Sequence, residues 1–552
     1  MTQVAEMRAG ALAHGDSARF DFVVVGGGSA GCLLANRLSE NPDIRVCLLE
    51  AGPSDHTYWI RSCNPFNMLY LMNSKKYNWL YKTEPEAANG SRGFFWPRGK
   101  ALGGSSSINA MIYTRGHRWD FDHWASLGNP GWDYQSVLPL FKRSERQQRG
   151  ADAWHGANGT MDVVDTNYHF PASEAFVDAS VQAGFARRDD FNGAEQDGCG
   201  FFQVTQTPQG RRCNSATAFL DEALARPNLT VITGAHASRV LFEGKKAVGV
   251  EYFLQPHLDQ RHVVSADREV VLSAGVINSP QLLKLSGIGP QHELHQFGIP
   301  VIHDLPGVGE NLQDHPDILI RCLDKSRTSF ATVPGKSTFD FIRRYFSRES
   351  PFVFTPTECG GFIKSSPDQE IPDLQLQFAS IRMEPHGKGL FMPAKFGFVL
   401  HICHLRPESR GRVLLRSGNP LDAPRIEANY FQREKELDAL VNGVKIGRQI
   451  LAQPAMAPFV QEEEMPGATV QSDAEIRRFI RNRVETVYHT AGSCKMGNDA
   501  MAVVDATLRV HGVEGLRVVD SSIMPTITGS NIHAPTVMIA ERGAQLMLEA
   551  LG

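Results

Sequence analysis

The chain has 552 residues, of which 42% are hydrophobic and 21% charged, ordinary proportions for a globular protein. Its 56 basic and 60 acidic residues leave a formal net charge of −4, which gives no general attraction to nucleic acid or to an anionic membrane. No apolar run approaches the roughly 20 residues of a membrane-spanning helix. The nine cysteines lack CxxC spacing and favour reduced thiols in a cytoplasmic protein.

A glycine-rich turn in the sequence FVVVGGGSAG lies between a short apolar strand and a predicted helix. Gly26 permits a tight turn, Gly28 lets a pyrophosphate approach the backbone, and Gly31 lets the helix pack close to the strand. Ser29 and Ala30 lead into the helix, whose free N–H groups and dipole favour phosphate. This pattern indicates a dinucleotide-binding turn.

The next predicted strand, RVCLLE, ends in Glu50, about 20 residues beyond the glycines. A carboxylate there can accept hydrogen bonds from both hydroxyls of an adenosine ribose, and it disfavours the 2′-phosphate of NADP. Because the turn is near the N-terminus and most of the 552 residues follow it, FAD is favoured over a nicotinamide cofactor.

Two irregular stretches follow this unit. Residues 57–96 are aromatic and turn-rich, and we expect them to pack on a ligand or on a second domain. Residues 98–109 contain the pair Gly103 and Gly104 followed by three serines, which can place backbone N–H groups and hydroxyls against a polar ligand. Since the chain turns apolar directly afterwards, this loop is expected in the interior.

The middle of the chain is rich in predicted strands, at residues 229–233, 238–243, 247–253 and 268–275. A helix is predicted from Asn278 with Pro280 in its first turn, and another over residues 173–183. Residues 320–475 alternate like an antiparallel sheet with one covered face, and VLHICHL and GRVLLRS are predicted to form a hairpin. The nucleotide-domain pattern returns after Ile480.

These elements predict an α/β Rossmann-like FAD-binding domain that is discontinuous, plus an α+β substrate domain with an antiparallel sheet. The predicted FAD-binding domain comprises residues 19–165, 206–318 and 479–552, and the substrate domain comprises residues 166–205 and 319–478. Residues 326–357 combine aromatics with four arginines, and form a lid, a membrane-touching patch or ordinary packed surface.

Two histidines lie in glycine-flanked loops near the returning nucleotide domain, His489 in YHTAGSCKMG and His533 in GSNIHAPT. Alone, either is more often structural, but a bound cofactor would be within reach of both. Alcohol oxidation removes a hydroxyl proton, which suits an imidazole, and a hydride, which suits flavin N5. A second polar group would bind the developing alkoxide. The final helix, expected to open at Pro535, would add positive potential near the flavin.

A metal site is not predicted. In a strand, His401 and Cys403 share one face while His404 points away, and no fourth ligand has plausible spacing. The stretch from Asn311 to Pro316 is interpreted as a polar structural turn, within which His315 is an outside candidate for function.

Together these features resemble the glucose-methanol-choline (GMC) family of FAD-dependent oxidoreductases, closest to its bacterial alcohol and choline dehydrogenase-like members. The sequences that carry the resemblance, in chain order, are GGGSAG with LLEAG, RGKALGGSSSINAMIYTRG, INSPQLLKLSGIG, VGENLQDH, SRGRVLL, YHTAGSCKMG and VVDSSIMPTITGSNIHAPT.

The resemblance implies that His489 is the catalytic base and that His533 occupies the second active-site position, which is Asn in choline-type members and His in several oxidases. Ile108 falls where some members carry a histidine linked to FAD, so the flavin is expected to be non-covalent. Expected cofactor contacts also include Arg98, Gly103, Gly104, Ser105, Asn109, Ala274, Asp520, Asn531, Ala534 and Pro535.

The expected reaction is FAD-dependent oxidation of a primary alcohol to its aldehyde, with electrons passed to a quinone or another carrier. The aromatic stretches favour an apolar or aromatic alcohol over a sugar. Two alternatives stay open: an oxidase that passes electrons to O2 and makes hydrogen peroxide, and a lyase in which the flavin is structural. A quinone acceptor would allow peripheral contact with the inner face of a membrane, and the oligomeric state is open.

Overall fold

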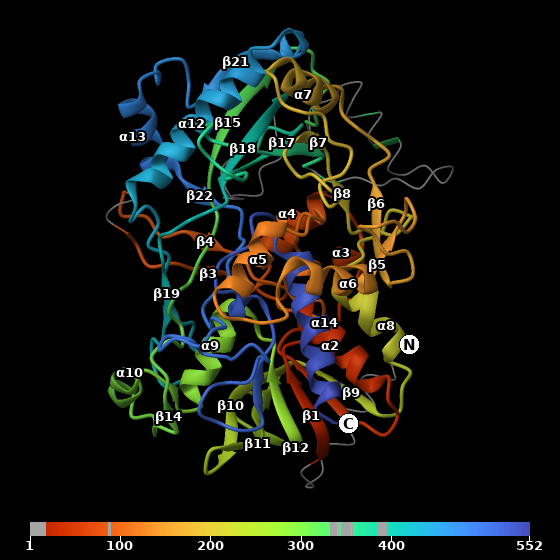
Figure 1. Cartoon of the computed structure of the whole chain (residues 1–552), viewed down its shortest axis with the longest axis vertical. Helices are drawn as coiled ribbons and strands as arrows, with labels where there is room; N and C mark the ends of the chain where they lie inside the picture. Colours follow the sequence, from red (N-terminus) through yellow and green to blue (C-terminus); the bar gives the residue numbers. More distant parts are fainter. Residues whose placement is uncertain are drawn as a thin grey trace.

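Two β-sheets organise the computed structural model, which describes residues 18–63, 65–86, 90–331, 357–383 and 395–551, together with residues 339, 342, 343 and 355. A mixed sheet fills the lower half of Figure 1, and an antiparallel sheet with helices on one side fills the upper half. The predicted fold class is therefore confirmed.

The first sheet has the strand order β10-β11-β12-β1-β2-β9, with β23 beside β12. Its strands are β1 (Arg19–Val25), β2 (Val46–Glu50), β9 (Leu229–Thr233), β10 (Ala235–Glu243), β11 (Lys246–Leu254), β12 (Arg261–Leu272) and β23 (Leu516–Val518). The strands β23, β12, β1, β2 and β9 run parallel, whereas β10 and β11 are antiparallel additions. Strand β2, which lies between β1 and β9, is buried along its whole length, as its largely apolar sequence predicts.

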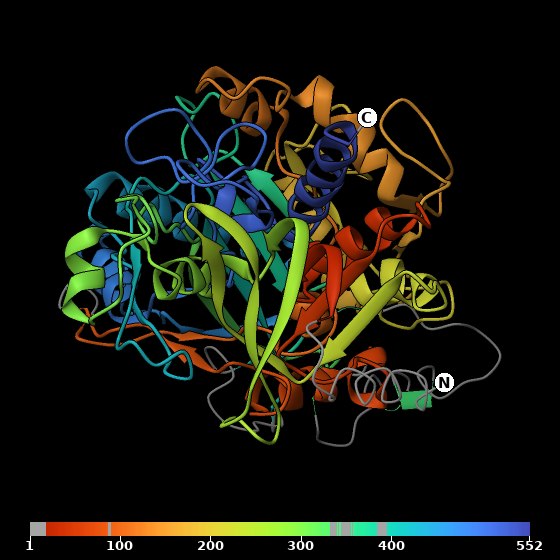
Figure 2. The same cartoon turned by 90° about the horizontal axis from the view of Figure 1, so that it is seen from below.

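Helix α2 (Ser29–Ser39) and helix α14 (His533–Glu549) pack side by side, red and blue in Figures 1 and 2. Buried Arg37 of α2 donates to Glu541 of α14 at 2.7 Å, and Ser144 at the end of α6 (Tyr134–Ser144) donates to the same carboxylate. The view from below in Figure 2 shows the twist of the sheet beside them. The N-terminal and C-terminal segments thus form one layer, as the discontinuous nucleotide domain requires.

Helix α9 (Gly275–Leu285) begins three residues before its predicted start, so Pro280 lies inside the helix rather than in its first turn. The cause is Asp520, whose carboxylate accepts the Gly275 N–H at 2.9 Å and the Ser279 hydroxyl at 2.6 Å. A carboxylate at a helix N-terminus satisfies free N–H groups and stabilises an early start. Helix α14 likewise begins before Pro535, at His533.

The second sheet is antiparallel throughout, in the order β21-β15-β18-β17-β16-β7, with β22 beside β15. Its strands are β7 (Gly198–Phe201), β15 (Pro316–Asp324), β16 (Cys359–Ile363), β17 (Leu374–Ala379), β18 (Gly397–His404), β21 (Val460–Met465) and β22 (Glu485–Thr486). Gly447 of α12 (Glu434–Leu451) packs on Ile320, Leu400 and Ile402. Because side chains alternate along a strand, Leu319 and His401 face the other way, toward the first sheet.

The predicted hairpin of VLHICHL and GRVLLRS is wrong. Strand β18 pairs with β15 and β17, while β19 (Arg412–Leu414) pairs with β20 (Arg425–Glu427). The intervening turn is held elsewhere, because the N–H groups of Glu408 and Ser409 donate to the carboxylate of Glu436. At the end of this turn, the backbone of Gly411 pairs with that of Leu312.

The remaining helices are α3 (Tyr58–Arg61), α4 (Pro65–Asn73), α5 (Arg118–Ser126), α7 (Pro171–Gln182), α8 (Asp221–Ala223), α10 (Gln291–Gln296) and α13 (Asp473–Arg483). The short strands are β3 (Tyr81–Lys82), β4 (Phe95–Trp96), β5 (Glu145–Gln147), β6 (Met161–Asp165), β8 (Gln203–Val204), β13 (Ile288–Gly289) and β14 (His303–Asp304). Each of the nine cysteines is buried with a free thiol. In the described part of the chain, every helix is too short or too polar to cross a membrane.

Two strands of the second sheet draw on segments that were predicted for the FAD-binding domain. Strand β15 begins at Pro316, before the predicted boundary at residue 318, and β22 lies at residues 485–486, within the segment assigned to the FAD-binding domain. Most of the stretch 326–357, interpreted as a lid or a membrane-touching patch, lies outside the described residues.

Candidate active site

A cavity of about 390 Å³ lies between the two sheets, with walls contributed by both. Fourteen of the candidate residues line it: Gly26, Gly28, Ser29, Ala30, Glu50, Arg98, Gly104, Ser105, Asn109, Ala274, His489, Asp520, Asn531 and His533. The other four candidates, Gly31, Gly103, Ala534 and Pro535, are absent from the described lining. Candidates from the whole length of the chain therefore meet at one cavity.

The glycine turn after β1 is built for a close backbone approach. Gly26 has φ +100°, and a Cβ added there would lie 2.5 Å from the Ser273 carbonyl oxygen. A Cβ on Gly31 would lie 1.9 Å from the Gly26 oxygen, so Gly31 serves the packing of the turn rather than the cavity wall. A Cβ added at Gly28 would have no described atom closer than 3.9 Å, and no side chain caps the N-terminus of α2. The open space and free N–H groups fit a phosphate.

A second glycine loop faces the first. Gly103 (φ +85°) precedes the 3₁₀ turn Gly104–Ser107, and its N–H donates to the Gly27 oxygen at 2.8 Å. A Cβ on Gly104 would lie 2.7 Å from Gly28 Cα. The two loops can touch only because Gly28 and Gly104 lack side chains. The hydrogen bond from Gly103 to Gly27 stabilises this contact.

Glu50, at the end of β2, accepts the Gly27 N–H at 2.9 Å and the Gly52 N–H at 2.7 Å. Burial raises the pKa of its carboxyl to about 7, and these two hydrogen bonds limit the rise. Glu50 thus supports the glycine turn itself and also borders the cavity where a ribose is expected.

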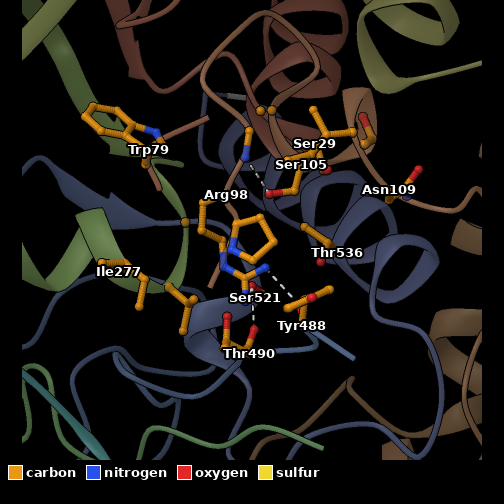
Figure 3. A pocket seen from close by; sticks show the side chains of 18 of the residues that line it. Ser29, Trp79, Arg98, Ser105, Asn109, Ile277, Tyr488, Thr490, Ser521 and Thr536 are labelled. Atoms are coloured by element: carbon orange, nitrogen blue, oxygen red, sulfur yellow. Dashed lines mark hydrogen bonds between the residues drawn. The ribbon is translucent and has the colours of Figure 1, made fainter. Parts of the chain in front are cut away.

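Arg98 is the clearest sign of a missing anionic or carbonyl partner. Its Nη1 donates to the Tyr488 carbonyl oxygen at 2.8 Å, and Figure 3 shows the guanidinium lying between Ser105 and Tyr488. Among the described residues, its buried Nε and Nη2 atoms have no hydrogen-bond partner. Burial lowers its pKa despite the charge of Asp314. Buried donors are normally satisfied, so these two fit a polar group of a bound ligand.

His489 occupies the centre of a buried hydrogen-bonded chain. Its Nε2 lies 3.1 Å from Nδ2 of Asn531, and its Nδ1 lies 3.1 Å from Nδ1 of His315. Burial, together with the positive charge of Arg98, lowers the pKa of His489 to about 3, so the ring is neutral.

The amide of Asn531 has a fixed orientation. Its Oδ1 accepts from the Thr114 hydroxyl at 3.1 Å and from Nε2 of Gln375 at 3.0 Å. Because Oδ1 faces these two donors, Nδ2 faces His489. Asn531, which sequence reasoning treated only as a cofactor contact, is therefore the polar partner of His489.

His533 lines the same cavity but has a different partner. Its Nε2 lies 3.1 Å from the hydroxyl oxygen of Ser215, and within the described structure its Nδ1 has none. Burial, together with the charge of Arg212, lowers its pKa to about 4. The loop GSNIHAPT contains both Asn531 and His533, and its sequence does not reveal which side chain turns toward His489.

His315 contacts His489 directly, a role that the sequence did not indicate. Gln313 and Ala491 form an antiparallel backbone bridge with N–H to oxygen distances of 2.9 Å in both directions. His315 follows Gln313 by two residues and His489 precedes Ala491 by two, so the bridge sets the two imidazoles opposite each other. The two histidines are 174 positions apart in the chain, so the local sequence carries no signal of their pairing.

The predicted alternation at His401 is confirmed, because His401 and Cys403 both meet the Asp317 carboxylate while His404 turns away. His401 Nδ1 lies 2.6 Å from Asp317, Cys403 Sγ lies 3.4 Å from the same carboxylate, and His404 turns to the Asp373 carbonyl oxygen. The one described cluster with metal-like spacing, Asp55, His56 and Asp221, already has Arg61 at 3.0 Å and 2.8 Å from its two carboxylates.

Comparison with known proteins agrees with this geometry. Family models described as GMC oxidoreductase match residues 20–317 and 407–540. The chain is 46% identical to an alcohol dehydrogenase [acceptor] of Pseudomonas putida over 96% of both chains, and 42% identical to mouse mitochondrial choline dehydrogenase over 96% of this chain and 89% of that one. The crystal structure of a pyridoxine 4-oxidase from Mesorbium loti superposes with a TM-score of 0.86 at 32% identity, over 96% of this chain and 99% of the other.

Proposed function

Since the chain belongs to the GMC oxidoreductase family, we propose that it oxidises a primary alcohol to the aldehyde and passes the electrons to an external acceptor. The observation that carries the proposal is the contact of a buried, neutral imidazole with an oriented amide, His489 Nε2 with Asn531 Nδ2, on the wall of the shared cavity.

FAD is the cofactor of this family, and the cavity suits it. The open space at Gly28 and the uncapped start of α2 fit the pyrophosphate, and Glu50 fits the ribose. The unpartnered donors of Arg98 fit an anionic or carbonyl oxygen. When bound, FAD supplies hydride acceptance at N5. Ile108 offers no nucleophile for a covalent link.

His489 serves as the base in this proposal. The fixed amide of Asn531 turns its Nδ2 donor toward Nε2 of His489, so Nε2 carries the lone pair and Nδ1 carries the proton. That proton points at Nδ1 of His315, which therefore accepts it. Burial and the neighbouring His489 lower the pKa of His315 well below its usual range, so this ring is neutral as well. The lone pair of Nε2 is then held toward the cavity, where it can take the hydroxyl proton of an alcohol.

Asn531 acts with His489 at the carbinol oxygen. As the alcohol enters, its oxygen approaches both the imidazole Nε2 and the amide N–H from the cavity and replaces the hydrogen bond between them. The amide then donates to the oxygen on which negative charge develops as the proton leaves. Because Thr114 and Gln375 already hold the amide, little reorganisation accompanies the reaction.

The acceptor is proposed to be a quinone or another carrier, by likeness to the alcohol dehydrogenase [acceptor] of Pseudomonas putida. The likeness to a pyridoxine 4-oxidase supports one alternative, transfer to O2 with production of hydrogen peroxide. Peripheral membrane contact belongs to the quinone variant of the proposal.

Anaerobic mixing of the FAD-loaded protein with aliphatic, aromatic and amino alcohols tests the proposal directly. Bleaching of the visible flavin absorption by a primary alcohol, with formation of one equivalent of aldehyde, is expected. Admitting air then separates an oxidase, which recovers colour quickly with hydrogen peroxide, from a dehydrogenase that needs a quinone or dye. Turnover without any flavin reduction would instead support the lyase alternative, and no bleaching by any alcohol would overturn the proposal.

A further inference from the structure

The second sheet presents a row of side chains to the cavity. Leu319 of β15 is directly opposite His401 of β18, which is directly opposite Gln377 of β17. Residues directly opposite each other across antiparallel strands project from the same face, with Cβ atoms about 5 Å apart. All three line the cavity, so they form one continuous strip of its wall, here called the outer row.

The neighbouring row leads to the proposed base. Asp317, Cys403 and Gln375 occupy the same strands two residues away, and Gln375 donates to Asn531 at 3.0 Å. Two residues along a strand span roughly 6–7 Å. The outer row therefore lies about that distance from the residue that holds Asn531, which contacts the proposed carbinol site.

His401 presents its Nε2 edge to the cavity and covers an acid. Its Nδ1 lies 2.6 Å from Asp317, whose side chain is completely buried, while 14% of the His401 side chain is exposed. Burial alone would lower the pKa of His401, but the charge and hydrogen bond of Asp317 outweigh it and raise the pKa. The imidazole thus keeps Nδ1–H on Asp317, and its free edge, Nε2, is available to a ligand.

Gln377 adds an amide donor beside it. The Nε2 atom of Gln377 is buried and has no partner among the described residues, although the residue lines the cavity. The other cavity residues of this region, Leu319, Thr357 and Met383, carry no carboxylate. A buried amide donor without a partner beside a paired imidazole indicates a place for an acceptor oxygen.

We propose that His401 and Gln377 form a subsite for a second oxygen of the substrate, so that the enzyme prefers alcohols that carry a carbonyl, ether or hydroxyl oxygen in addition to the carbinol oxygen. The proposal rests on the alcohol oxidation proposed above and narrows its substrate class. An apolar alcohol of equal length leaves the Gln377 amide donor without a partner.

The same geometry disfavours choline. A quaternary ammonium group is stabilised by a carboxylate or by the face of an aromatic ring. Asp317 lies one register position from the outer row, but its side chain is completely buried and paired with His401. A cation at this wall would therefore meet the edge of the imidazole and the Gln377 amide donor instead of a carboxylate.

Matched substrates that exchange one CH2 group for oxygen test the subsite. The pairs are hexan-1-ol with 4-methoxybutan-1-ol, and 4-ethylbenzyl alcohol with 4-methoxybenzyl alcohol; 3,3-dimethylbutan-1-ol is the neutral counterpart of choline. Anaerobic flavin reduction gives the apparent Kd and the limiting rate constant for each. We expect the oxygen member of each pair to have about a tenfold or greater advantage in kcat/KM, and choline to fall below its neutral counterpart.

The variant His401→Asn retains an amide donor for Asp317 but removes the Nε2 edge, and it is expected to abolish the difference between the oxygen member and the apolar member of each pair. His401→Gln, whose amide reaches the Nε2 position, is expected to retain part of the preference. His404→Asn, on the same strand but not among the described cavity residues, is the control and should keep the full preference. If His401→Asn fails to hold FAD, Gln377→Met provides the same test.

The outcomes separate the two proposals. If no alcohol reduces the flavin of the unmodified protein, alcohol oxidation fails and the subsite falls with it. If both members of each pair reduce the flavin equally well, or if His401→Asn and Gln377→Met keep the preference, the subsite is overturned and alcohol oxidation stands. A choline advantage over 3,3-dimethylbutan-1-ol would also overturn it.

Discussion

The Nε2 atom of His489 lies 3.1 Å from the Nδ2 atom of Asn531, although the two residues are 42 positions apart in the chain. The opposite edge of the same ring meets His315 at 3.1 Å. With both edges of the imidazole held, its tautomer and orientation are set before a substrate enters, which is what a general base in a buried site requires.

Replacing His489 by Ala should lower the rate constant of flavin reduction by about 10²- to 10⁴-fold, the usual contribution of a positioned base. The reason is that the variant loses the imidazole nitrogen that contacts the Asn531 amide. Stopped-flow reduction under anaerobic conditions measures the effect, and the ratio of FAD to protein serves as the control. Full turnover in this variant would rule out His489 as the base.

Asn531→Ala and His533→Ala should differ. Loss of a donor to the developing alkoxide costs about 10²- to 10³-fold, so Asn531→Ala is expected to reduce flavin slowly. His533→Ala should cost less than about tenfold, because its ring meets Ser215 and not His489. Reduction rates at saturating alcohol give the comparison. A larger loss for His533→Ala at normal FAD content would return His533 to the second active-site position.

His315 is proposed to be a positioning residue, and the predicted effect depends on the replacement. His315→Leu removes the acceptor for the His489 Nδ1 proton, and we expect about a tenfold slower reduction with an altered pH profile. His315→Gln retains an acceptor oxygen and should recover much of the rate. Equal losses in both variants, with an unchanged pH profile, would indicate a packing role only.

The local features of the fold could be predicted from the sequence. The glycine turn and Glu50 belong to a strand, helix and strand that follow each other directly, so their spacing alone fixes the chemistry expected of Gly26 and Gly28. The strand at residues 229–233 was predicted with its observed bounds because four of its five residues, in the sequence LTVIT, are β-branched.

The contacts that failed to be predicted are those between distant segments. The hairpin prediction used proximity in sequence, but β18 pairs instead with β15 and β17. His315 and the Asn531 amide acquire their roles only through the bridge at Gln313 and the donor from Gln375. Periodicity and spacing describe neighbours along the chain and carry no information on such pairings.

Gly28→Ala should fold normally and bind FAD poorly. Gly28 has φ −83°, and an added Cβ would have no described atom within 3.9 Å, so the protein itself tolerates the methyl group. The methyl would instead occupy the space proposed for the pyrophosphate. Gly31→Ala is the contrasting variant, because its Cβ would lie 1.9 Å from the Gly26 oxygen, and we expect it to lower Tm. Unchanged FAD content in Gly28→Ala would contradict the cofactor placement.

The buried histidines predict an acid-sensitive fold. In the native state the pKa is about 3 for His489 and about 4 for His533, both below the ordinary value of 6.5. Between these values the unfolded chain binds more protons than the native protein. The free energy of unfolding therefore falls as the pH falls below about 6.5, by up to about 1.4 kcal/mol per pH unit for each ring.

Glu50 acts in the opposite direction, since its raised native pKa of about 7 makes the native protein hold its proton more tightly than the unfolded chain, so that stability is lost as the pH rises from 4.5 toward 7. Because Glu50 is present both in the unmodified protein and in a His533 variant, its contribution cancels when the two proteins are compared. His533→Gln cannot titrate and should lose less stability than the unmodified protein between pH 6.5 and about 4. Urea unfolding followed by tryptophan fluorescence at several pH values gives both curves. Parallel curves would mean that His533 is protonated as readily in the native protein as in the unfolded chain.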